Sequence, residues 1–183
     1  MRKLLNAEIK NIRLNPSNIK NIVRNPITIL LDNVRSLYNV GSIFRTCDAA
    51  LAKELVLAGF TPHPPRIEIE KTALGAVDTV PWRYFKSTLE AIDKLRSEGN
   101  NIIAVEITDT SRNYDKLTID DFPICLILGN ELTGIDNQIL AMCDDAIEIP
   151  MYGVKHSLNV SVANGIVLFE AIKIWKNIID INT

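Results

Sequence analysis

The stretch ITILLDNVRSLYNVGSIFRTCDAALAKELVLA, residues 27–58, decides the fold class. Its first six residues form a mostly apolar run, which predicts a buried strand over 27–32. Residues 54–58 (ELVLA) predict a second strand. Between the two, apolar residues recur at helical spacing, which predicts a helix over about 39–52. A strand, a helix and a second strand in succession are typical of parallel sheets covered by helices.

The same alternation continues along the rest of the chain. A Pro-rich loop is expected over 59–66, because proline fixes the backbone and removes a hydrogen-bond donor. Residues 87–98 predict a helix with a Ser87–Glu90 capping box and a closing Gly99. Further strands are expected at 101–107, 124–128 and 145–149, and further helices near 135–142 and over about 158–180. The fold class is therefore α/β, a mostly parallel sheet flanked by helices.

Composition narrows the class of protein. The 183 residues are 47% hydrophobic and 23% charged, which is typical of a folded domain and unlike a disordered chain. The three cysteines are scattered, so neither a disulfide framework nor a metal site is expected. No apolar run approaches the ~18 residues of a membrane span, and no signal-peptide pattern opens the chain. We expect a cytoplasmic protein with no membrane contact.

Charge is unevenly distributed. Residues 1–24 carry six basic side chains against the single Glu8, whereas the remainder holds 14 basic and 21 acidic side chains. We divide the chain into a basic N-terminal extension, 1–25, and a main domain, 26–183. A basic arm on an acidic body favours an anionic partner, and a solvated amphipathic helix is the alternative.

Ligands of parallel sheets bind beyond the carboxyl ends of the strands, so three loops are of interest. The first belongs to NVRSLYNVGSIFRT, residues 33–46. Asn39 is expected to cap the helix there, and Gly41 lies one turn before Arg45, leaving a bare turn beside the guanidinium. That gap would admit a phosphate, a ligand or another subunit. A capped helix with a solvated arginine is the alternative.

The second loop belongs to ICLILGNELTGI, residues 124–135. A strand ending at Gly129, followed by Glu131 and Gly134, lets a ligand approach the backbone closely. The pattern is neither a Walker A loop nor a dinucleotide-binding GxGxxG. Glu131 is placed to orient a hydroxyl or an arginine, and an ordinary turn with a surface glutamate is the alternative.

The third loop belongs to IEIPMYGVKHSLNVSVANGIVLFEA, residues 147–171. Ser157 and Asn159 lie at the start of the last helix, where polar side chains are usually caps. His156 has the chemistry of a general base, but the sequence shows no partner for it.

Together the three stretches resemble the SpoU-type (TrmH-like) RNA ribose 2′-O-methyltransferases of the SPOUT superfamily. The first carries the family's N-x-G-x-x-x-R motif and the second its G-x-E-x-x-G motif. The third carries I-P-M followed by S-L-N-V-S-V-A, and all three occur in the family's order. The residues that match are Asn39, Gly41, Arg45, Gly129, Glu131, Gly134, Ile149, Pro150, Met151, Ser157, Leu158, Asn159, Val160, Ser161 and Ala163.

The resemblance implies a fold, a cofactor and partners. It implies a C-terminal trefoil knot, a homodimer, S-adenosyl-L-methionine as cofactor and RNA, either tRNA or rRNA, as substrate. It implies Arg45 as activator of the 2′-hydroxyl or stabiliser of the alkoxide, serving its own or the partner subunit's cofactor. Asn39, Glu131, Ser157 and Asn159 would orient the substrate and Arg45. The implied cofactor-binding residues are Leu128, Gly129, Gly134, Ile149, Pro150, Met151 and Leu158.

Other functions stay open on the sequence alone. A non-catalytic RNA-binding SPOUT protein would keep the fold, although Arg45, Glu131 and Asn159 are all present. A SPOUT enzyme that methylates a tRNA base is a second alternative, against which the N-x-G-x-x-x-R motif speaks. A nucleotide-binding oxidoreductase is a third, but no dinucleotide fingerprint follows any strand.

Overall fold

The computed structural model describes residues 1–14, 19 and 22–181, with backbone only for 178–181. Seven strands are described: β1 (Asn25–Asp32), β2 (Ala52–Ala58), β3 (Trp82–Phe85), β4 (Asn101–Val105), β5 (Arg112–Asn113), β6 (Ile124–Leu128) and β7 (Asp145–Glu148). The helices are α1 (Asn6–Asn11), α2 (Leu37–Ala49), α3 (Ile67–Ala73), α4 (Ala76–Thr79), α5 (Thr88–Ser97), α6 (Asn137–Leu140) and α7 (Val160–Ile181), with 3-10 turns η2 (Tyr114–Lys116) and η3 (Ile119–Asp121).

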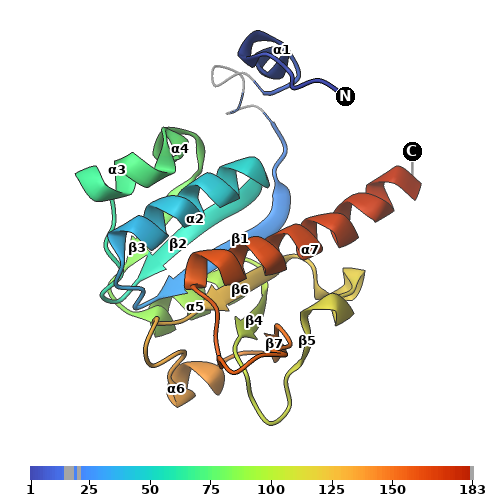
Figure 1. Cartoon of the computed structure of the whole chain (residues 1–183). Coiled ribbons are helices and arrows are strands. Elements are labelled where there is room, and N and C mark those ends of the chain that lie inside the picture. Colours follow the sequence, from blue (N-terminus) through green and yellow to red (C-terminus); the bar gives the residue numbers. More distant parts are fainter. Residues whose placement is uncertain (15–18, 20–21, 182–183) are drawn as a thin grey trace.

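The strands form one sheet in the order β3-β2-β1-β6-β4-β7-β5, and their pairings are parallel (Figure 1). The chain runs outward from β1 through β2 to β3, then crosses to β4 on the other side of β1. Strand β6 later inserts between β1 and β4. The helices that follow β1 and β6 lie on opposite faces of the sheet, which opens a crevice at the carboxyl ends of these two strands.

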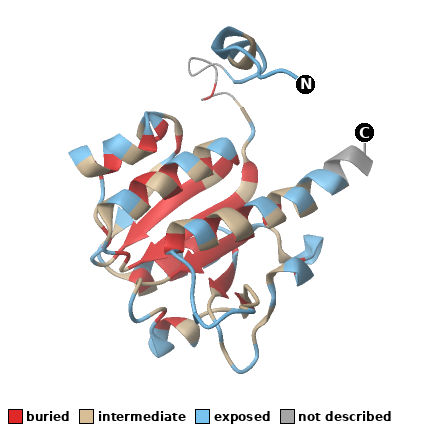
Figure 2. Ribbon diagram, in the orientation of Figure 1, coloured by how far each residue is buried: buried red, intermediate tan, exposed pale blue. Residues whose placement is uncertain are grey.

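Two apolar cores cover the two faces of the sheet. Ile27, Ile29 and Leu31 of β1 point to one face and pack with α2, α3 and α7, whereas Leu30 points to the other and packs with α5 and α6. The side chains of a strand alternate between faces, so a strand buried on both sides is apolar throughout. Figure 2 shows the central strands buried along their length and the outer surfaces of the helices exposed.

The predicted alternation of strands and helices is confirmed, with shifts at the ends of elements. Helix α2 begins two residues earlier than expected and ends at Ala49, because Leu51 takes a left-handed backbone conformation (φ 48°). The strand expected over 101–107 ends at Val105. The Ser87–Glu90 capping box is wrong: Ser87 occupies the N-cap position of α5, but its side chain makes no capping hydrogen bond.

The basic arm carries a short helix that stands apart from the body (Figure 1). Helix α1 has no buried residue, and the apolar Leu5 and Ile12 that flank it are exposed. Lys20, counted in the arm's charge, lies outside the described residues. In the described part of the chain, no helix combines the length and apolarity that crossing a membrane requires.

Candidate active site

The three predicted loops meet at the carboxyl ends of β1, β6 and β7. The Glu131 carboxylate accepts hydrogen bonds from the backbone N–H of Arg35 (2.9 Å) and of Ser36 (3.1 Å) and from the Asn39 side chain (2.9 Å). The Asn159 amide in turn donates to Asn39 Oδ1 (3.1 Å). A continuous polar chain therefore joins the second motif to the first and the first to the third.

This chain of hydrogen bonds fixes the charge on Glu131. Burial alone would raise the pKa of the carboxyl group. The N–H donors of Arg35, Asn39 and Ser36 outweigh burial and hold its pKa below the ordinary 4.5. At neutral pH the side chain is therefore an ionised acceptor that anchors the start of α2.

The capping of helix α2 leaves the Asn39 side chain free to join the polar chain. Asn39 was expected to cap α2, but the cap is Ser36, whose hydroxyl accepts from the Asn39 N–H (3.3 Å). Ser and Asn are both good caps, and the helix starts at the earlier of the two. The Asn39 side chain is thus free to bridge Glu131 and Asn159. Asn159 meets the expectation of a cap, since its Oδ1 accepts from the Ser161 N–H (2.9 Å) at the start of α7.

A cavity of about 510 Å³ lies beside this polar chain. Of the seven residues predicted to bind the cofactor, six line it, and Pro150 does not. Glu131 and Ser157 line it as well, whereas Asn39, Asn159 and Arg45 do not. The predicted cofactor-binding residues in the wall are Leu128, Gly129, Gly134, Ile149, Met151 and Leu158.

Two glycines shape the cavity wall. A Cβ on Gly129 would lie 2.5–2.6 Å from backbone atoms of Gly134 and Ile135. Gly134 has a left-handed φ of 67° and closes a tight turn in which its N–H and C=O bond to Asn130 (2.9 and 3.1 Å). The close approach predicted at Gly129 is therefore filled by the chain's own backbone, and the spacing of the two glycines is what lets the turn close.

Arg45 lies outside the cavity. It sits on the exposed outer side of α2 and makes no side-chain hydrogen bond or ion pair with the described residues. The bare turn at Gly41 admits no ligand in this chain, because α3 fills it. A Cβ there would lie 2.0 Å from Thr72 Oγ1 and 2.3 Å from the Ile69 carbonyl oxygen.

The cavity wall holds further polar residues that the predicted site did not include, among them Glu106 and Asn130. Glu106 directly follows β4, and its carboxylate accepts from the N–H of Ile107 (3.0 Å) and of Ile135 (3.1 Å). Asn130 donates to the Asn33 carbonyl (2.8 Å) and accepts from the turn that follows it. His156 also lines the cavity. Glu106 was detectable, because it is a polar residue placed directly after a buried strand.

Comparisons with known proteins match most of the chain. The tRNA (guanosine(18)-2′-O)-methyltransferase of Thermus thermophilus is 34% identical over 145 residues, 79% of this chain and 73% of that enzyme. The 23S rRNA (guanosine-2′-O-)-methyltransferase RlmB of Vibrio parahaemolyticus is 32% identical over 165 residues, 88% of this chain and 66% of that one. The solved structure of an AdoMet-bound rRNA methyltransferase from Sinorhizobium meliloti matches with a TM-score of 0.77 and 30% identity, covering 85% of this chain and 59% of that one.

The family assignment rests on the greater part of the chain. Residues 26–169 match the SpoU rRNA methylase family, and this span contains β1 apart from its first residue, β6, β7 and all three motifs. The chain belongs to the SpoU rRNA methylase family.

Proposed function

We propose that this protein transfers a methyl group from S-adenosyl-L-methionine to a ribose 2′-hydroxyl of RNA. One observation carries the proposal: the second and third family motifs line a single cavity, and Asn39 of the first motif is hydrogen-bonded to Glu131 and to Asn159 beside it. The related enzymes that methylate guanosine 2′-hydroxyls in tRNA and in 23S rRNA support the same reaction.

The cavity fits the cofactor. Its volume of about 510 Å³ lies in the range of small-molecule sites, and Leu128, Ile149 and Leu158 give it apolar walls suited to an adenine ring. When bound, S-adenosylmethionine supplies a methyl group already activated on a sulfonium centre. The protein's task is then to position a hydroxyl in line and to stabilise the charge that develops on its oxygen.

We assign the stabilisation of that charge to Arg45. A guanidinium stays protonated at neutral pH, so it acts by stabilising an alkoxide and gripping the adjacent phosphate rather than as a general base. Because Arg45 stands outside the cavity of its own chain, we propose that it serves the cavity of a partner subunit in a homodimer.

Helix α7 offers a surface for such a dimer. Val162 and Phe169 are 50% and 48% exposed. They are seven residues apart and so lie on one stripe of the helix. Helix α7 packs beside α2 over the same face of the sheet (Figure 1), so a partner that covers this stripe also comes close to α2.

The two predicted parts of the chain take different roles in this proposal. Residues 26–183 form the methyltransferase domain, and the extension 1–25 contacts RNA phosphates through Lys3, Lys10 and Arg13. The polar chain of Asn39, Glu131 and Asn159, with Ser157, orients the ribose and the incoming Arg45. A cytoplasmic location is part of the proposal and is supported by the bacterial tRNA and rRNA methyltransferases that the chain resembles.

Radiolabelled S-adenosylmethionine tests the reaction. The protein is incubated separately with unmodified tRNA and rRNA, and the labelled RNA is digested and mapped. Label on a ribose 2′-oxygen is expected, and the RNA that carries it identifies the substrate class. Label on a base would replace the reaction by base methylation. Absence of label from an RNA-binding protein would favour a non-catalytic role.

A further inference from the structure

A second cavity, also of about 510 Å³, opens at the carboxyl ends of β1, β2 and β3. Helix α6 separates it from the cofactor cavity, since Asn137 and Leu140 face the first and Gln138 and Ile139 face the second. We call it the β1–β3 recess. Its chemically distinctive lining residues are Asp32, Phe60, Tyr84, Lys86, Asp136 and Gln138.

A buried carboxylate with a spare acceptor lines the recess. Asp32 is only 2% exposed. Its Oδ1 accepts from the Thr88 hydroxyl (2.5 Å) and the Asn33 side chain (2.9 Å), whereas Oδ2 receives no hydrogen bond from the part of the chain that the structure describes. Oδ2 is not one of the fully buried atoms that lack a partner, so it is accessible from the recess, where it can accept a hydrogen bond from a ligand. Burial also raises the pKa of Asp32, which makes it a stronger acceptor.

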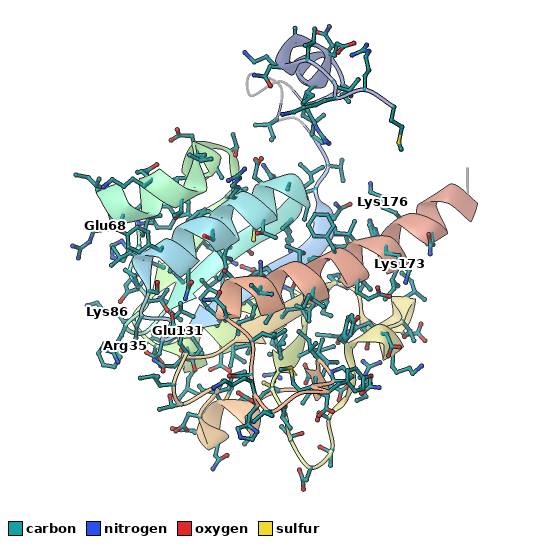
Figure 3. The ribbon with its side chains drawn as sticks, viewed as in Figure 1. Arg35, Glu68, Lys86, Glu131, Lys173 and Lys176 are labelled. Carbon is teal, nitrogen blue, oxygen red and sulfur yellow. The ribbon has the colours of Figure 1, made fainter. Side chains whose placement is uncertain are left out.

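The rim of the recess carries an aromatic ring and a cation. Phe60 is 88% exposed, and its backbone N–H donates to Asn33 Oδ1 (2.9 Å), which holds the rim in place. Lys86 is exposed and stands at the same end of the molecule as Arg35 and Glu131 (Figure 3). A nucleobase can stack on an exposed aromatic ring, and an ammonium group on the same rim can bind the phosphate next to that base.

We infer that the β1–β3 recess binds a nucleobase of the RNA substrate that carries an exocyclic amino group. The amino group donates to Asp32 Oδ2, the base stacks on Phe60, and Lys86 contacts the backbone phosphate. Uracil is excluded, because its one ring N–H lies between two carbonyl oxygens that the carboxylates of Asp32 and Asp136 repel. This inference rests on the proposed function, since it names a sequence preference for that enzyme's RNA.

Short oligonucleotides test the recess without methyl transfer. Labelled oligoadenylate, oligocytidylate and oligouridylate are titrated into the protein by fluorescence anisotropy, with saturating S-adenosylhomocysteine to occupy the cofactor cavity. OligoA and oligoC are expected to bind more tightly than oligoU. Phe60→Ala should weaken both by roughly 5- to 150-fold. The matched control is Ile67→Ala, which removes another exposed apolar side chain (72%) outside the recess and should change neither affinity.

A second variant gives a signature that a structural role would not. In Asp32→Asn, the amide oxygen keeps the bonds from Thr88 and Asn33, and the amide N–H₂ replaces the unmatched oxygen. The preference should then turn toward oligoU, whose carbonyls accept from the amide. The inference would be overturned if the wild-type protein bound the three oligonucleotides equally or bound none of them measurably. It would also be overturned if Asp32→Asn left the base preference unchanged. Base preference without any methyl transfer would instead overturn the proposed function and leave the recess standing.

Discussion

Two regions of the molecule carry motifs of the same family: the loops after β6 and β7, and the outer side of α2. They differ in whether the motif residues contact one another within a single chain. Glu131 and Asn159 are bonded through Asn39, and Gly129 is locked against Gly134. Arg45, on the outer side of α2, is exposed and lies apart from the cavity. The difference is what the proposed function requires, in which one chain binds the cofactor and a second supplies the arginine for transfer.

Replacing Arg45 should have the largest effect on methyl transfer, and it should leave cofactor binding by the other region unchanged. Arg45→Lys keeps the charge but loses the planar fork that grips an oxyanion and a phosphate together. Turnover with RNA should fall by about a hundredfold, while the affinity for S-adenosylhomocysteine measured by calorimetry stays unchanged. Full activity in this variant would rule out a bidentate role for the guanidinium.

Gly129→Ala should instead impair the loop after β6 and the cofactor cavity that it borders. The added Cβ meets backbone atoms at 2.5–2.6 Å, so the turn at Gly134 has to move. We expect a destabilisation of about 1–3 kcal/mol in thermal unfolding. We also expect at least a tenfold loss of S-adenosylhomocysteine affinity, about 1.4 kcal/mol.

Gly153→Ala is the matched control for this substitution. Gly153 lies in the loop after β7, and no heavy atom comes within 4 Å of its added Cβ. Stability and cofactor affinity should both stay at the wild-type level. Equal behaviour of Gly129→Ala and Gly153→Ala would show that the close approach at Gly129 does not shape the cavity.

Glu131→Gln should reveal the anchoring of α2 through its pH dependence. The pKa of Glu131 is lowered in the folded protein, so its stabilisation is fully present above the ordinary 4.5 and is lost as pH falls through the folded value. At pH 7 the variant should unfold about 1–3 kcal/mol more easily. The gap to wild type, followed by urea unfolding at several pH values, should close in acid. A gap that widens in acid would contradict the ionised anchor.

Removing charge from the basic arm should have the smallest effect, a weaker salt dependence of RNA binding. Replacing Lys3, Lys10 and Arg13 by alanine removes positive charge from a segment with no buried residue around α1. The slope of log K for RNA binding against log salt should fall by about 0.7–0.9 for each lost phosphate contact. An unchanged slope would mean that the arm does not touch RNA.

Long apolar segments made most of the fold predictable. Strands β1, β2 and β6 and helix α7 follow directly from apolar runs and helical spacing, because burial on both faces leaves little room for polar residues. The four-residue edge strand β3 and the two-residue strand β5 were missed. Short edge strands are half exposed, so their sequences carry no clear period.

Most of the predicted cofactor-binding residues line the cavity, but the hydrogen bonds around it could not be read from the sequence. Ser36 and Asn39 are both suitable caps three residues apart, and the sequence does not say which one starts α2. Gly41 signals a close approach without saying what approaches, and α3 proved to be the neighbour. The trefoil knot and the role of Arg45 stay predictions from the resemblance.

Subunit complementation tests the central claim that one chain holds the cofactor and a second supplies the arginine. Arg45→Ala, which lacks the guanidinium, and Gly129→Ala, whose cavity binds the cofactor weakly, are mixed under conditions that exchange subunits. Methyl transfer to RNA is measured at an S-adenosylmethionine concentration too low to fill the Gly129→Ala cavity. A mixed dimer pairs an intact cavity with an intact Arg45 across the interface, so activity should recover to about a quarter of wild type. If the mixture stays as inactive as its two components although mixed dimers form, Arg45 does not act across subunits, and the account is contradicted.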